Sequence, residues 1–115
     1  MKELAEKIKR FTAERDWDRY HSPKNLAMAL SVEATEILEH FQWLTQAQSR
    51  ALPPDKLGRV RDEIGDVVIY LAMLADKLGI DPIEAALGKL EKNRENYPAE
   101  RVRGRADKYT EYGSS

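Results

Sequence analysis

The feature that most constrains this chain is a long series of apolar residues at helical spacing between a proline pair and a glycine. Steps of three and four residues separate its members, which are Leu57, Val60, Ile64, Val67, Leu71, Leu74 and Leu78. Such steps place apolar side chains on one face of an α-helix. Pro53-Pro54 stops any helix that precedes the series, and Gly79 favours an end after it. The pattern predicts one long helix with a buried face.

Three further helices are predicted, at about residues 4–13, 23–46 and 82–96. Ser22-Pro23 and Asp81-Pro82 each combine an N-cap residue with the residue best tolerated in a first helical turn. No segment indicates a strand, and the residues after Tyr97-Pro98 are polar and expected to be irregular. The predicted fold is therefore all-α, a helical bundle of about four helices per chain. We expect a single domain over residues 1–112 and a flexible tail at 113–115.

The composition argues against several classes of protein. With 34% of its 115 residues charged and a net charge of −1, the chain has no basic surface for a nucleic acid polymer or a membrane. Its longest apolar run, residues 67–75, is much shorter than the roughly 20 residues that a membrane span needs. The absence of cysteine fits a cytoplasmic setting. A chain of this length buries only about two-thirds of its unfolded surface, so packing between subunits would help it.

Two pairs of acidic residues interrupt the predicted apolar faces. Glu33 occupies a position that should continue the apolar face of its helix, and Glu36 follows three residues later. Glu63 and Asp66 repeat this spacing on the long helix, and residues three apart lie on one helix face. No lysine or arginine lies between residues 24 and 50, or between residues 61 and 77. Glu33, Glu36 and Asp66 therefore lack a lysine or arginine one helical turn away in the sequence.

Helix length predicts that the two acidic pairs lie at one level. Glu36 lies roughly 15 Å before the expected end of its helix, and Glu63 lies roughly 12 Å after the start of the next. If the two helices pack antiparallel, the four carboxylates converge in a poorly hydrated groove. Like charges at such distances repel one another unless a cation neutralises them. Oxygen ligands without cysteine or histidine suit Mg²⁺, with Mn²⁺ as a substitute, far better than zinc.

Each acidic pair also has a simpler interpretation. Acidic residues three apart on a helix are commonly solvated, and we interpret Glu39 and Asp62 in that way.

A ferritin-like di-iron site is a different metal hypothesis, and it requires a histidine three residues after a glutamate. The residues three before His21 and His40 are an aspartate and an isoleucine. That di-iron motif is therefore absent.

Longer segments resemble a known family. E-x-x-E followed by E-x-x-D on two helices is similar to the signature of the all-α nucleoside triphosphate pyrophosphohydrolases, the MazG-like superfamily. Five segments resemble the dCTP pyrophosphatase branch of that superfamily: ERDWDRYHSPKNLAMAL, HFQW, RDEIGDVVIYLAMLA, KNRENYPA and KYTEY. The resemblance covers the chain from about Ile8 to Tyr112. It implies the architecture of that superfamily, completed by homo-oligomerisation as a dimer of dimers.

The resemblance also implies an activity and a set of site residues. The activity is Mg²⁺-dependent cleavage of dCTP, or a modified dCTP, to dCMP and pyrophosphate, which clears unwanted nucleotides. Four residues would be metal-binding and catalytic, one of them accepting the proton of the attacking water: Glu33, Glu36, Glu63 and Asp66. Two would face the phosphates and sugar: Lys89 and Asn93. The residues nominated for the base are Trp17, His21, Asn25, Trp43 and Tyr70.

Several of these assignments have alternatives. Trp43 and Tyr70 would otherwise pack in a core, and His21 would otherwise bond to loop backbone. In an antiparallel helix pair, Trp43 and Tyr70 flank the acidic groups from opposite sides, so one pocket that uses both needs a second chain. The first helix offers no residue with an assignable role, which leaves open other dNTPs or non-canonical NTPs as substrates. A non-enzymatic helical oligomerisation module is the rival from another class.

Overall fold

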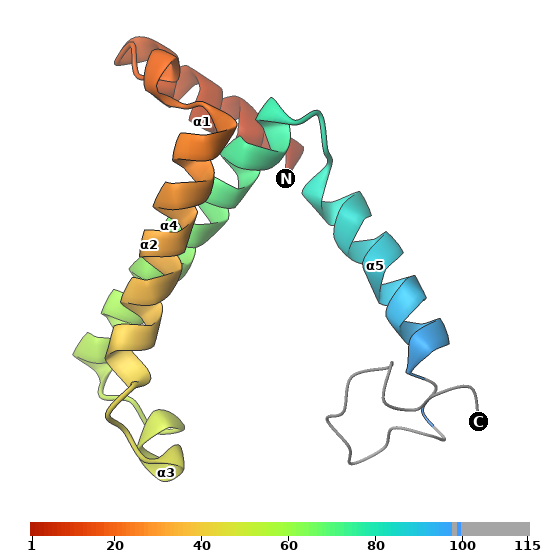
Figure 1. The fold of residues 1–115 in the computed structure, drawn as a ribbon. Helices are drawn as coiled ribbons and strands as arrows, with labels where there is room; N and C mark the ends of the chain where they lie inside the picture. Colours follow the sequence, from red (N-terminus) through yellow and green to blue (C-terminus); the bar gives the residue numbers. More distant parts are fainter. Residues whose placement is uncertain (98, 100–115) are drawn as a thin grey trace. The chain divides into compact units, whose positions relative to one another are not determined.

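The structure is a computed structural model that describes residues 1–97 and 99. In these residues the chain forms helices and no strand: α1 (Lys2–Glu14), the 3₁₀ turn η1 (Asp18–Tyr20), α2 (Pro23–Phe41), α3 (Gln46–Ser49), α4 (Pro54–Lys77) and α5 (Pro82–Asn96) (Figure 1). The all-α prediction is confirmed. The described residues contain five α-helices instead of about four because the short α3 is separate from α2.

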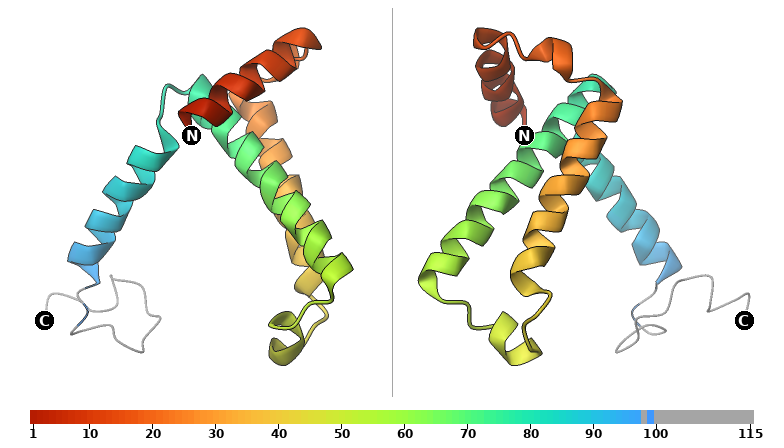
Figure 2. Two further views of the ribbon diagram at one scale, coloured as in Figure 1. Left: turned by 180° about the vertical axis from the view of Figure 1, so that it is seen from behind. Right: turned by 60° about the vertical axis from the view of Figure 1, so that its left-hand side comes forward.

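The centre of the fold is an antiparallel pair of helices. α4 packs along α2, and Figures 1 and 2 show the two side by side. Ser22 caps α2, because its Oγ accepts a hydrogen bond from the N–H of Asn25 at 3.2 Å. α4 starts at Pro54 and ends at Lys77, and Gly79 beyond it has a φ of 68°, which residues with a side chain rarely adopt. Both ends of α4 agree with the sequence prediction.

The end of α2 differs from the prediction. We expected the helix to continue to about Gln46, but it ends at Phe41. Thr45 starts a new helix instead, because its hydroxyl accepts the N–H of Gln48 at 3.1 Å while the Gln48 side chain accepts the N–H of Thr45 at 2.9 Å. This reciprocal cap requires a turn before Thr45. Trp43 lies in that turn and is 85% exposed.

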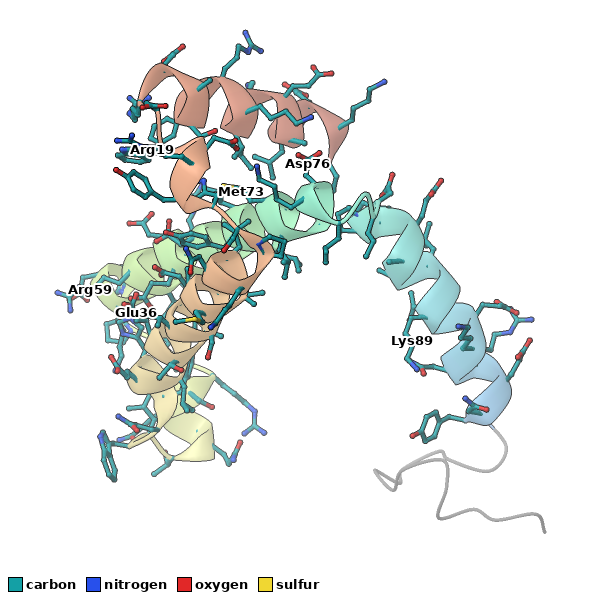
Figure 3. The ribbon with its side chains drawn as sticks, turned by 45° about the horizontal axis from the view of Figure 1, so that its top comes forward. Arg19, Glu36, Arg59, Met73, Asp76 and Lys89 are labelled. Atoms are coloured by element: carbon teal, nitrogen blue, oxygen red, sulfur yellow. The ribbon has the colours of Figure 1, made fainter. Side chains whose placement is uncertain are left out.

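α1 packs against the last turns of α4. Its buried residues are Ile8 and Thr12, and the Thr12 hydroxyl donates to the carbonyl of Ile8 at 3.1 Å. Figure 3 shows Met73 and Asp76 on this part of α4, and Glu36 on α2 farther along the helix pair. The buried apolar residues of the described chain are few, namely Ile8, Leu26, Val60, Ala72 and Ala75. Many large apolar side chains on α2 and α4 stay exposed, among them Met28, Val32, Leu38, Leu57, Ile64 and Leu71.

The chain divides into two compact units. One is Met1–Pro82 and the other begins at Ile83, and each is described by itself. No described helix combines the length and apolar character of a membrane span. Apart from residue 99, the predicted irregular segment after Tyr97-Pro98 and the predicted tail at 113–115 lie outside the described residues. The single domain over residues 1–112 stays a prediction.

Candidate acidic site and adjoining pocket

Four carboxylates lie close together on α2 and α4. Burial raises the pKa of Glu33, and a hydrogen bond and the charge of Glu36 raise it further. The charges of Asp66 and Glu63, on the facing helix, act on Glu33 in the same direction. A glutamate whose pKa is raised by the other three acids must lie near all of them. The structure therefore brings both acidic pairs to one level of the α2–α4 pair, as the helix lengths predict.

Two oxygens of this group are buried and have no hydrogen-bond donor. They are Oε2 of Glu33 and Oε2 of Glu63. A buried carboxylate oxygen without a partner is costly, and a hard divalent cation is one group that satisfies it. Among the described residues, however, no three aspartate, glutamate or histidine side chains stand where they could hold one metal ion. The oxygen donors fit Mg²⁺ or Mn²⁺ chemically, and binding one would require these side chains to rotate toward it.

His40 is a neighbour of the acidic group that the sequence analysis missed. Its Nε2 lies 2.8 Å from Oε2 of Glu63, and the two side chains are only 18% and 21% exposed. The contact is an ion pair when the imidazole is protonated, and its geometry is not that of a hydrogen bond. We considered His40 only as a di-iron ligand and counted only lysine and arginine as cations, so its contact with Glu63 was not predicted. Its position one helical turn after Glu36 is the signal that could have identified it.

A large pocket adjoins Asp66. Its volume is about 400 Å³, within the range of small-molecule sites. Three of the residues nominated for the base line it together with Asp66: Trp17, His21 and Tyr70. Its other walls are mainly apolar and come from α1 and α4: Leu4, Ile8, Phe11, Ile69 and Met73. An aromatic and apolar pocket with a carboxylate at one edge can bind a planar base and orient it by hydrogen bonds.

Local contacts hold Trp17 at this pocket. The backbone N–H of Trp17 donates to the carbonyl of Thr12 at 3.0 Å, immediately after Asp16 adopts a positive φ of 52°. The indole then meets the ring of Phe11 edge to face, with centroids 5.7 Å apart. Arg15 places its guanidinium 3.7 Å from the centroid of the Phe11 ring. The turn after α1 therefore presents Trp17 in a defined orientation.

The remaining nominated residues lie elsewhere. The Asn25 side chain donates to the carbonyl of Tyr20 at 3.0 Å and supports the turn before α2, and Asn25 does not line the pocket. Trp43 lies in the turn between α2 and α3, also apart from the pocket lining. Lys89 and Asn93 belong to α5, in the second unit. The roles of these four residues stay predictions.

The chain is similar to known proteins. The model of the MazG-like family matches residues 28–112. Two curated proteins named dCTP pyrophosphatase 1, from Mus musculus and Homo sapiens, are 42% and 41% identical to this chain over 103 residues. These matches cover 88% of this chain and 61% of each relative, so the chain spans less than two-thirds of their length.

A solved structure is also similar. The crystal structure of a pyrophosphatase from Archaeoglobus fulgidus aligns with a TM-score of 0.80 and 43% sequence identity, over 85% of this chain and 92% of that one. With the family model matching residues 28–112 and the helices agreeing in space, the chain belongs to the MazG-like family.

Proposed function

We propose that this chain is a nucleoside triphosphate pyrophosphohydrolase that converts dCTP, or a modified dCTP, to dCMP and pyrophosphate. The observation that carries the proposal is the Glu33 carboxylate, whose Oε2 is buried and which lies near three other acids beside the pocket of Trp17, His21 and Tyr70. A triphosphate nucleotide has an aromatic base at one end and a metal-binding polyanion at the other. The pocket and the acidic group match these two ends. The identity to proteins named dCTP pyrophosphatase 1 supports the choice of substrate.

The carboxylates are proposed to hold Mg²⁺, with Mn²⁺ as a substitute, through Glu33, Glu36, Glu63 and Asp66. When bound, such a cation lowers the pKa of a water and neutralises charge that develops on the phosphates. One of the four carboxylates accepts the proton of the attacking water. Trp17 and Tyr70 stack against the base, while His21 offers polar atoms at its edge. In this arrangement the base lies in the pocket, and the phosphates lie at the acidic group, where cleavage takes place.

Assembly is part of the proposal. Large apolar side chains exposed on α2 and α4 favour a homo-oligomer, for which we propose a dimer of dimers in the cytoplasm. A neighbouring chain could then contribute Trp43, which is far too exposed to act as core. Lys89 and Asn93 are proposed to contact the phosphates and sugar, and Asn25 supports the turn that carries His21.

A nucleotide panel tests the activity. Purified protein is incubated with Mg²⁺ and each dNTP, together with 5-substituted dCTP and non-canonical NTPs, and pyrophosphate release is measured. We expect the highest kcat/KM for dCTP or its modified forms. A preference for another dNTP would refute dCTP as the substrate and would leave the proposed pyrophosphohydrolase reaction in place. No pyrophosphate from any nucleotide, at a protein concentration that gives a folded oligomer, would refute the enzyme.

The exposed apolar faces also support a second candidate, a non-enzymatic oligomerisation module. Calorimetric titration with a non-hydrolysable dCTP analogue separates the two functions. An enzyme should show Mg²⁺-dependent heat of binding, and Glu33→Gln should abolish it. A module that only assembles should show no such heat.

A further inference from the structure

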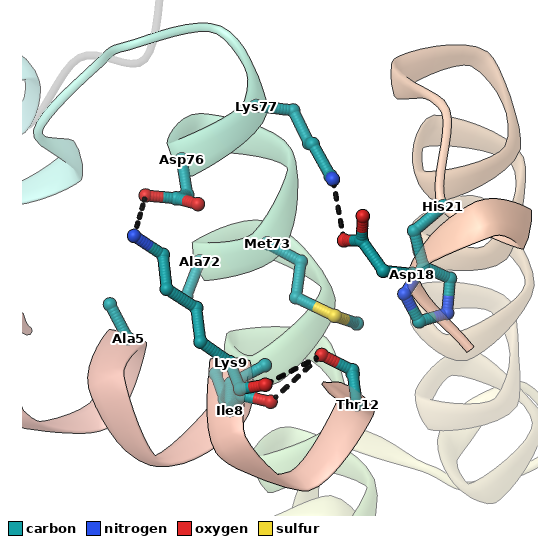
Figure 4. A pocket seen from close by; sticks show the side chains of 10 residues that line it. All are labelled: Ala5, Ile8, Lys9, Thr12, Asp18, His21, Ala72, Met73, Asp76 and Lys77. Atoms are coloured by element: carbon teal, nitrogen blue, oxygen red, sulfur yellow. Dashed lines mark hydrogen bonds and ion pairs between the residues drawn. The ribbon is translucent and has the colours of Figure 1, made fainter. Parts of the chain in front are cut away.

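One ion pair connects the turn before α2 to the far end of α4. Lys77 Nζ donates to Asp18 Oδ1 at 2.6 Å, although the two residues are 59 positions apart in the chain. The same contact is the main reason why the pKa of Asp18 lies below its ordinary value. Figure 4 shows this pair beside His21, on one side of Met73. It is a tertiary contact that ties residues 17–21 to a rigid helix.

Residues 17–21 carry two walls of the proposed base pocket. Trp17 directly precedes Asp18, and His21 follows it by three residues, with its backbone N–H donating to the Asp18 carbonyl at 2.9 Å. A small second cavity has Asp18 and Lys77 in its lining. The two cavities share four lining residues: Ile8, Thr12, His21 and Met73. A shift of Asp18 would therefore be transmitted directly to the walls of the large pocket.

A second ion pair nearby does not involve residues 17–21, although both of its residues also line the small cavity. Lys9 Nζ lies 3.4 Å from Asp76 Oδ1 and links α1 to the same turn of α4 (Figure 4). Neither Lys9 nor Asp76 lines the large pocket. The Lys9–Asp76 pair also joins a lysine to an aspartate, and Asp76 directly precedes Lys77 in α4. This pair is therefore a matched control for the Asp18–Lys77 pair.

We propose that Asp18 and Lys77 are a positioning pair for substrate binding, which holds Trp17 and His21 in place before the nucleotide arrives. This inference rests on the proposed function, because it assigns a role within the proposed base pocket. Neither residue contacts the base itself. Ordering the pocket in advance lowers the entropy lost on binding, so the pair acts on affinity and leaves the chemical step unchanged.

A double-mutant cycle tests the pair through kinetics. Asp18→Ala, Lys77→Met and the double variant are each expected to raise KM by about three- to fivefold, the range for partly exposed ion pairs, with kcat within about twofold of wild type. The double variant should lose no more than either single variant. Lys9→Met and Asp76→Ala should leave KM unchanged. Unchanged KM in the Asp18 and Lys77 variants, additive losses, or equal losses in the control pair would overturn the proposal.

Fluorescence supplies a measurement that does not depend on turnover. Trp43→Phe leaves Trp17 as the single tryptophan, since the chain contains two. In that background, Asp18→Ala and Lys77→Met should increase quenching of Trp17 by acrylamide, while Asp76→Ala should not. If acrylamide quenches Trp17 equally in these variants and in the Trp43→Phe protein with Asp18 and Lys77 intact, the positioning role is refuted, even if the enzyme is active. Absence of turnover by the wild-type protein would instead refute the proposed function, with the quenching result still deciding whether the pair holds the segment.

Discussion

Glu33→Gln should stabilise the protein without metal while it abolishes activity. One oxygen of the Glu33 carboxylate, Oε2, is buried without a hydrogen-bond donor, and three other acids lie near this carboxylate. An unsatisfied buried polar group costs about 1–3 kcal/mol, and a charged one costs more. Replacing the charge with a neutral amide of the same shape should therefore recover on the order of 1 kcal/mol at neutral pH. For a unit of this size that corresponds to a rise in Tm of about 4–8 °C.

The pH dependence of this effect follows from the raised pKa of Glu33. The fold favours the protonated form, so the contribution of Glu33 to stability is fully present below its ordinary pKa of 4.5 and is lost as the pH rises through the higher folded-state pKa. Wild type and Glu33→Gln should thus melt at similar temperatures in acid. The variant should become the more stable protein as the pH rises toward about 8.

Thermal melts by circular dichroism, in chelator and across this pH range, measure the difference. Glu39→Gln is the matched control, because Glu39 lies on the same helix and is exposed. Mg²⁺ should raise the Tm of wild type and of the control more than that of Glu33→Gln. Turnover by Glu33→Gln should fall about 100-fold or more, whereas Glu39→Gln should keep it. A Glu33→Gln protein that melts below wild type at neutral pH, or that retains activity, would contradict this account of the acidic group.

Three further predictions concern the pocket, the acidic group and the core. Trp17→Ala should raise the KM for dCTP about tenfold, because stacking on the base is lost. Tyr20→Ala removes an exposed aromatic side chain outside the pocket lining and should leave KM unchanged, so equal effects of the two variants would argue against the pocket. His40→Leu should weaken Mg²⁺ binding about tenfold in calorimetry, because residues that contact a ligating carboxylate orient it toward the metal. His40→Gln should recover part of the lost affinity, and unchanged affinity in His40→Leu would exclude a role for His40 in orienting Glu63. Leu26→Ala should lower the free energy of unfolding by about 2–5 kcal/mol in urea melts, since Leu26 is 1% exposed, and a loss below about 1 kcal/mol would contradict its place in the core.

Local signals predicted most of the helices correctly. Proline after an N-cap residue marked the starts of α2 and α5, and the glycine after the apolar series marked the end of α4, because these residues act on the adjacent backbone alone. The end of α2 was missed by five residues. The apolar pattern continues through Phe41 and Leu44, whereas the Thr45–Gln48 cap that interrupts it depends on side-chain bonds that compete with the helix.

The candidate site was predictable where helical spacing controls it. Spacing alone placed the four acids on two faces, and helix length placed those faces at one level, so both follow from one repeat of 3.6 residues per turn. The contact between His40 and Glu63 was not predicted, because it joins two helices whose rotation about their axes no local pattern specifies.

Sequence by itself determined that the chain is helical, where most of its helices begin and end, and that α2 and α4 each carry two acidic residues one turn apart on one face. Tertiary structure decided that Trp17, His21 and Tyr70 share a pocket at Asp66, that His40 meets Glu63, and that Lys77 reaches Asp18. The reason is physical. Helix periodicity and capping act within a few residues, whereas a pocket depends on how α1 and the turn before α2 pack against the end of α4.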